Sequence, residues 1–151
     1  MGQVVEARAR SSAAPAQVYA VLADVTCWTR WGIWTRAVVE RPAPDGGTGP
    51  GAVRALTSRV LGRTIVSRER VTDAVPGELL AYELLSGLPL RDYRGRIELR
   101  PDGAGTALRW ESRFTRATPG LTWFYRLLFA RFLADTVARA ARYAESGHAA
   151  P

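Results

Sequence analysis

Apolar and polar residues alternate along most of the chain between residues 3 and 115, with the two-residue period of β-strands. This pattern predicts seven strands, at residues 3–10, 33–40, 52–60, 63–72, 78–86, 91–100 and 106–115. Short connections join the last five strands, so neighbours are expected to pair antiparallel. The segment 42–51 is rich in Pro and Gly and predicts a loop. A mobile flap and a long hairpin connection are both compatible with it, and we favour the connection.

Two regions have the pattern of helices instead. Ser11, Ser12 and Pro15 signal a first helix start, and residues 24–31 predict a second short helix or turn. Pro119 is predicted to begin a long helix that runs to about residue 145. Its second half carries charge on one face, at Arg131, Asp135, Arg139, Arg142 and Glu145, and small or apolar residues on the other, at Phe129, Leu133, Thr136, Val137, Ala140 and Ala144.

This order of elements predicts an α+β fold. A strongly curved antiparallel sheet of about seven strands would wrap around the long C-terminal helix, with two short helices after the first strand. Such an arrangement tends to leave a mostly apolar pocket between sheet and helix, where ligands often bind. We expect residues 1–151 to form one ligand-binding domain, whose tail from about residue 146 is disordered.

The turns of the predicted hairpins set which residues share a face. If Leu61 and Gly62 form a two-residue turn, Arg54 lies opposite Glu69 on the concave face, as a cross-strand ion pair. Leu56 opposite Ser67 and Ser58 opposite Ile65 share that face, whereas Arg59, Arg68 and Arg70 lie on the solvent face. Two explanations of this pair remain possible from the sequence. It is either a structural ion pair near the strand ends or a pair that binds or acts on a ligand.

The next two hairpins extend the concave face. A turn at Gly87-Leu88 sets Tyr82 opposite Tyr93, and a turn within 100–105 sets Trp110 opposite Gly95 and Leu108 opposite Ile97. The inward residues are then Leu80, Tyr82, Leu84, Tyr93, Ile97, Leu108, Trp110, Ser112 and Phe114. The residues expected to face water are Glu83, Arg94, Arg96, Glu98, Arg109, Glu111 and Arg113. The inward aromatic residues either line a pocket or simply fill the core.

Composition narrows the function classes. The net charge is +7 and all 21 basic residues are arginines, but they are scattered rather than clustered, which argues against nucleic-acid binding. The single histidine, His148, lies in the predicted tail, so neither a metal site nor a histidine-based catalytic triad is expected, and no cofactor is implied. One cysteine, no signal-peptide pattern and no membrane-spanning apolar run together predict a cytoplasmic protein.

Several short segments, in this order and spacing, resemble one known superfamily. They are residues 18–25, Trp28, Trp31, 49–54, 69–71, 80–82, 88–93 and 105–110. The chain resembles the helix-grip (START-like, SRPBCC) superfamily, and within it the polyketide cyclase/dehydrase group, over residues 3–145. That superfamily includes enzymes, lipid carriers, hormone receptors and stress proteins, so the fold alone does not decide the function.

The resemblance implies a biosynthetic cyclase, aromatase or dehydratase that acts on an aromatic or polyketide-type molecule. Arg54 would hold a carbonyl or carboxylate oxygen, Glu69 would take a proton, and Tyr82 or Tyr93 would donate one. The residues expected to line the ligand site are Trp31, Leu56, Ser67, Tyr93, Trp110, Phe114, Phe129, Leu133 and Val137. The alternative is a non-catalytic carrier or sensor of a hydrophobic small molecule or lipid, which the absence of a core histidine favours.

Two further expectations concern partners and surfaces. The positive charge suits an acidic acyl carrier protein. Residues 121–133 are apolar almost all round the predicted helix, more than one sheet can cover. A homodimer contact and a membrane-facing patch both account for the surplus, and from the sequence we favour the dimer contact. The resemblance also puts Trp28, Trp31 and Trp34 near the pocket entrance, although packing is the better explanation for Trp28.

Overall fold

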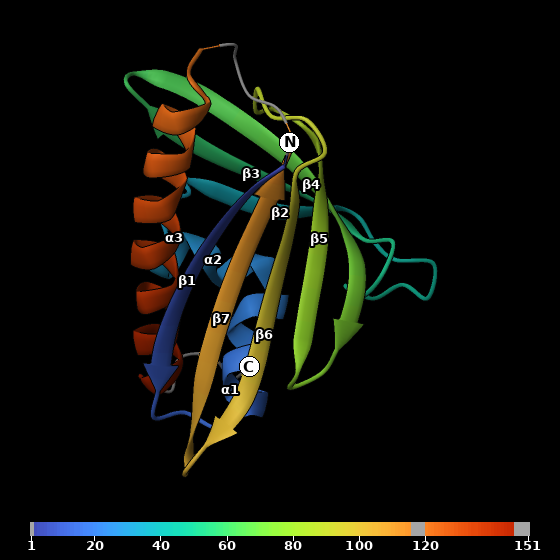
Figure 1. Cartoon of the computed structure of the whole chain (residues 1–151). Helices are drawn as coiled ribbons and strands as arrows, with labels where there is room; N and C mark the ends of the chain where they lie inside the picture. Colours follow the sequence, from blue (N-terminus) through green and yellow to red (C-terminus); the bar gives the residue numbers. More distant parts are fainter. Residues whose placement is uncertain (1, 116–119, 147–151) are drawn as a thin grey trace.

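The computed structural model describes residues 2–115 and 120–146, and these form one curved antiparallel sheet with helices on its concave side (Figure 1). The strands are β1 Gln3–Ser11, β2 Arg36–Arg41, β3 Val53–Val60, β4 Arg63–Val75, β5 Leu79–Ser86, β6 Arg94–Asp102 and β7 Gly105–Phe114. The helical elements are α1 Pro15–Ala23, the 3-10 turn η1 Val25–Cys27, α2 Trp28–Trp31 and α3 Thr122–Glu145.

The seven strands form a single sheet in the order β1-β7-β6-β5-β4-β3-β2, with every neighbouring pair antiparallel. The first and last strands of the chain lie side by side, from Gln3 opposite Phe114 to Ser11 opposite Thr106. Helix α3 packs mainly on β1 and also on β7, and α1 packs against β5, β6 and β7 (Figure 1). The predicted α+β fold of a seven-stranded sheet around a long C-terminal helix is therefore confirmed.

The core lies between the concave face and the helices because inward and outward residues alternate along each strand. In β6, for example, Gly95, Ile97 and Leu99 are buried, whereas Arg94 and Arg96 are exposed. Only the second half of α3 has a fully buried face, formed by Leu133, Thr136, Val137, Ala140, Ala141 and Ala144. This face matches the predicted apolar stripe, so the amphipathic pattern positions the helix correctly.

Three predicted element starts are wrong by three residues. Strand β6 begins at Arg94 rather than at residue 91. Helix α3 begins at Thr122 rather than at Pro119, which lies outside the described residues. Strand β2 begins at Arg36, because the chain before it still leaves the α2 turn: Ile33 is 43% exposed while Trp34 turns back into the core. The expected disorder of the tail also falls mostly outside the described residues.

Two of the three predicted registers are shifted by two residues. Tyr82 lies opposite Gly95 rather than Tyr93, because β5 and β6 are joined by residues 87–93 and not by a two-residue turn. Trp110 lies opposite Ile97, because the β6–β7 turn is only two residues long. A shift of two leaves every side chain on its predicted face. One outward residue still differs from expectation, since Glu111 is buried on the convex side beneath Arg109 and Arg113.

The loop of residues 42–51 connects the hairpin of β2 and β3, as favoured from the sequence. Its turn is closed by Gly46 N donating to Ala43 O at 2.8 Å and by Ala43 N donating to Gly47 O at 2.8 Å. The Ala43 side chain is buried, so the loop is attached to the core at this residue.

Candidate functional site

An ion pair between Arg54 and Glu69 lies on the concave face of the sheet. The two residues are directly opposite each other in β3 and β4, as the hairpin turn predicted. Arg54 Nε and Nη2 donate to Glu69 Oε2 at 3.1 and 3.0 Å. The side chains are only 4% and 11% exposed. Because both hydrogen bonds end on Oε2, Oε1 of the carboxylate accepts no hydrogen bond from Arg54.

Two aromatic rings enclose the guanidinium group of Arg54. Its Cζ lies 4.6 Å from the centroid of Trp28 and 4.9 Å from that of Tyr82. Contacts of this kind stabilise a cation that has lost its water. The indole of Trp28 is itself held by a hydrogen bond from Nε1 to Val21 O at 3.1 Å, which fixes the ring beneath the guanidinium.

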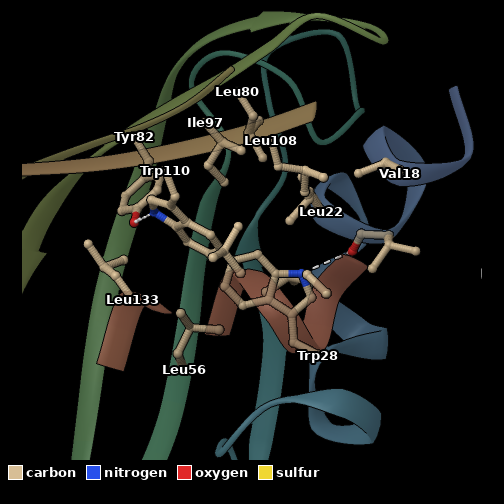
Figure 2. Packing of buried hydrophobic residues seen from close by; sticks show 14 of the residues in the cluster. Val18, Leu22, Trp28, Leu56, Leu80, Tyr82, Ile97, Leu108, Trp110 and Leu133 are labelled. Carbon is tan, nitrogen blue, oxygen red and sulfur yellow. Dashed lines mark hydrogen bonds between the residues drawn. The ribbon is translucent and has the colours of Figure 1, made fainter. Parts of the chain in front are cut away.

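Two tyrosine hydroxyls extend this polar cluster into the apolar core. Trp110 Nε1 donates to Tyr82 Oη at 3.0 Å, as Figure 2 shows. Tyr93 Oη and Ser112 Oγ are hydrogen-bonded at 2.9 Å. The two tyrosine rings lie 6.4 Å apart between centroids. Arg54, Glu69 and Tyr82, the three predicted catalytic residues, are thus brought together, with Tyr93 beside them.

Burial sets the protonation behaviour of these groups. Burial raises the pKa of Glu69, and the positive charge of Arg54 offsets only part of that effect. Burial likewise raises the pKa of Tyr82 well above its ordinary value and that of Tyr93 to about 12. The tyrosines therefore stay neutral hydrogen-bond donors at physiological pH, and the Glu69 carboxylate is a stronger base than an exposed one.

Irregularities in β4 surround the position of Glu69. The pairing of β4 with β5 shifts between Arg68 and Glu69 and again between Val71 and Asp73. Such bulges bend a strand and redirect its side chains. The Glu69 carboxylate therefore lies beside an irregularity of β4 rather than in a regular stretch of the strand.

The predicted ligand-lining residues all lie on the concave side. Phe129 of α3 connects two of them, with its ring 5.7 Å from Tyr93 and 6.0 Å from Phe114. The others are buried or nearly so: Trp31, Leu56, Ser67, Trp110, Leu133 and Val137. Figure 2 shows Leu56 and Leu133 on the same side of the core as the Tyr82–Trp110 contact.

These residues pack against one another in this structure. Three hollows among the described residues lie elsewhere, one of about 710 Å³ beside the first half of α3 and two of about 530 and 630 Å³ on the convex face of the sheet. None of these three hollows is lined by a residue predicted to line the ligand site. The internal pocket stays a prediction.

Sequence reasoning missed two members of the cluster. Packing is the favoured sequence-based explanation for Trp28, but its ring also contacts the Arg54 guanidinium, because the fold brings α2 beneath β3. Ser112 was placed on the inward face but given no role, although a polar residue two positions after Trp110 in an inward series is a detectable signal. Trp31 and Trp34 join Trp28 as a buried aromatic group, with ring centroids 4.9–5.7 Å apart.

Two features are absent from the described residues. No group of three or more His, Cys, Asp or Glu side chains in residues 2–115 and 120–146 is arranged to hold a metal ion. In the same residues, no helix has both the length and the apolar character needed to cross a membrane.

A curved antiparallel sheet that grips a long C-terminal helix, with two short helices after the first strand, defines the helix-grip class of proteins. A family model described as polyketide cyclase / dehydrase and lipid transport matches residues 2–145. The chain belongs to this family. No protein with a curated function matches the sequence closely enough to count as a relative.

Solved structures with the same fold have diverse descriptions. The Zhui aromatase/cyclase from Streptomyces sp. R1128 has a TM-score of 0.81 at 18% identity, over 96% of this chain and 94% of that chain. A START superfamily protein from Mycobacterium smegmatis has a TM-score of 0.82 at 14% identity, over 95% and 97%. Ara h 8.0201 has a TM-score of 0.78 at 14% identity, over 97% and 99%. At these identities the similarity shows a shared fold.

Proposed function

We propose that the protein is a cyclase or dehydratase that acts on a polyketide-type or aromatic small molecule between the sheet and α3. The observation that carries this proposal is the buried Arg54–Glu69 pair, whose Oε1 accepts no hydrogen bond from Arg54. A buried ion pair adds little to stability, since desolvation offsets much of the attraction. Its position beside two tyrosine hydroxyls in an apolar core favours a chemical role.

The groups suit an intramolecular aldol reaction. Glu69 Oε1 takes a proton from the carbon between two carbonyl groups, and the Arg54 guanidinium stabilises the enolate oxygen. The enolate carbon forms a bond to a second carbonyl carbon of the same chain, and the new alkoxide receives the proton carried by Glu69, with Tyr82 or Tyr93 donating a hydrogen bond. In dehydration, Glu69 takes a second proton from the ring carbon and returns it to the leaving hydroxyl, which departs as water.

The second candidate is a carrier or sensor of a hydrophobic small molecule. The observation in its favour is that the polar groups in the core already form hydrogen bonds with one another, Tyr82 with Trp110 and Tyr93 with Ser112. The family description, which includes lipid transport, and the likeness to Ara h 8.0201 are compatible with this role. An acidic acyl carrier protein and a homodimer both stay predictions about the partners of this protein.

Binding and turnover separate the two candidates. Mass spectrometry of small molecules that co-purify with the protein would identify the ligand class. A poly-β-keto thioester would then serve as substrate, with product formation followed by absorbance and binding by quenching of tryptophan fluorescence. An enzyme converts the thioester, whereas a carrier binds an apolar ligand and leaves the thioester unchanged.

A variant that keeps the shape of the site tests the base. Glu69→Gln should retain thioester binding and lose turnover, because the amide cannot take the proton. The matched control is Glu98→Gln on the convex face, where Glu98 pairs with Arg96 and Arg109. Full turnover by Glu69→Gln would remove Glu69 from the mechanism. Turnover by neither the variant nor the parent, with binding by both, would establish the carrier.

A further inference from the structure

We propose that one end of the molecule docks on an anionic lipid bilayer. This docking end consists of the first half of α3 and the tip of the β3–β4 hairpin, with the apolar residues Leu61, Trp123, Phe124, Leu127 and Leu128 and the basic residues Arg59, Arg63, Arg126 and Arg131. Figure 1 shows the hairpin tip and the first turns of α3 at the same end of the molecule, with the β4–β5 and β6–β7 turns at the opposite end. The inference is independent of the proposed function.

The first half of α3 exposes large apolar side chains that no sheet covers. Trp123 is 68% exposed, Leu127 56% and Leu128 47%. Trp123 and Leu127 lie one turn apart and, together with Arg126, line the hollow of about 710 Å³ that opens along the helix. Exposed apolar groups of this density mark interaction sites on soluble proteins.

The hairpin tip provides a second, separate observation. Leu61 is 98% exposed and its φ is +52°, in the left-handed region that Asn and Gly normally occupy in such turns. A branched apolar residue there gains nothing from burial within the chain. Arg59 and Arg63 lie on either side of it and are exposed, so an apolar tip is again flanked by positive charge.

The positive charge of the docking end indicates which kind of partner binds there. The chain has no Asp or Glu between residues 120 and 134. None of the four arginines of the docking end forms an ion pair with another described residue. Apolar side chains flanked by unpaired arginines match a bilayer surface, where Trp and Leu enter the interface and Arg contacts lipid phosphates.

The same charge pattern opposes a dimer through this surface, which the sequence alone had favoured. A twofold contact brings the same patch together from both copies. It would therefore bring the arginines of one copy close to those of the other, with no carboxylate of the patch to separate them. A net charge of +7 on each chain adds to the repulsion.

Intrinsic fluorescence gives a direct test, because Trp123 is the exposed tryptophan among five. Trp28, Trp31, Trp34 and Trp110 are each no more than 8% exposed. With vesicles of phosphatidylcholine and about 30% phosphatidylglycerol, the protein should co-sediment and its emission should shift to the blue. Brominated acyl chains should quench it. Pure phosphatidylcholine vesicles should bind much more weakly.

Variants on and off the docking end complete the test. Trp123→Ser with Leu127→Ser, and separately Leu61→Ser, should weaken partitioning, whereas Val75→Ser at the opposite end should not. Arg126→Gln should weaken partitioning into the anionic vesicles by about fivefold. Arg142→Gln, which removes the same charge from the far end of α3, should have a smaller effect.

Three results would overturn the proposal. The first is a protein that does not co-sediment with anionic vesicles. The second is co-sedimentation that is equal for the parent and the docking-end variants. The third is a concentration-dependent dimer in sedimentation velocity that Trp123→Ser abolishes, without vesicle binding, which would assign the surface to a second copy. Ligand binding in the core is measured in parallel and should be unchanged by these variants.

Discussion

The ring of Tyr82 packs directly over Gly95, its partner on the neighbouring strand β6. A Cβ atom at position 95 would lie 2.1 Å from Tyr82 Cζ and 2.3 Å from its hydroxyl oxygen. Only a residue without a side chain allows the ring to lie flat against the sheet. This contact directs the hydroxyl of Tyr82 to Trp110 and its ring face to Arg54.

Gly95→Ala should destabilise the protein and disturb the polar cluster. The added methyl group must displace a rigid, buried ring, and overpacking of this kind costs about 1–3 kcal/mol. Denaturant unfolding measures the loss, and the emission of the buried tryptophans should change as the Trp110 hydrogen bond is altered. Gly49→Ala is the control, because a Cβ there meets nothing within 4 Å. Equal stability of the two variants would contradict the packing argument.

A double-mutant cycle on Arg54 and Glu69 should separate stability from function. Arg54→Met or Glu69→Leu alone should cost about 3–5 kcal/mol, because each leaves a buried charge without its partner. The double variant should regain most of that loss while ligand binding or turnover stays impaired. The control is the ion pair of Arg68 and Glu40, whose side chains are each 44% exposed. An exposed pair of this kind contributes about 0–1 kcal/mol to stability.

The pH dependence of the stability of Arg54→Met should identify Glu69 as the buried charge left without a partner. Burial raises the pKa of Glu69 even with Arg54 present, and losing the arginine removes the opposing effect. A carboxyl group whose folded pKa is raised stabilises the fold below its unfolded pKa and loses that contribution as pH rises through the folded value. Arg54→Met should therefore unfold more easily at pH 8 than at pH 5, relative to the parent. A constant difference across this range would contradict the prediction.

Alkaline pH should unfold the protein through its buried tyrosines. Burial raises the pKa of Tyr93 from 10.0 to about 12 and that of Tyr82 further. Their protonated forms therefore stabilise the fold fully below pH 10, and the contribution is lost as pH rises toward 12. Because the chain has no lysine, few other groups titrate in this range. In a pH titration, tyrosinate absorbance should show a component that appears only at high pH, and Tyr82→Phe and Tyr93→Phe should each reduce it. Absence of this component would contradict the burial of the two tyrosines.

Cys27 should react slowly in the folded protein. Its thiol is buried, and Sγ donates to Asp24 O at 3.1 Å and to Val21 O at 3.4 Å. Burial raises the pKa of the thiol, which lowers the fraction of reactive thiolate. Labelling with a disulfide reagent should be at least about tenfold slower in buffer than in denaturant. Equal rates would show that the segment around η1 opens readily.

The sequence by itself determined the order of the elements, the faces of the strands and the Arg54–Glu69 pair. These depend on local rules: a two-residue period separates the faces, and the Leu61-Gly62 turn sets the register of its own hairpin. The same period explains why registers wrong by two residues around Tyr82 and Trp110 still assigned every concave residue to the correct face.

Only the tertiary structure decided which concave residues meet. The Trp28 ring reaches Arg54 because α2 folds beneath β3, a contact across 26 positions that no turn or period encodes. The Tyr82 ring lies where Gly95, on another strand, has no side chain. The sequence already indicates a surplus of apolar residues in α3, but only the packing on the sheet decides which of them stay exposed. Local patterns fix the direction of a side chain, whereas its neighbours depend on how distant segments pack.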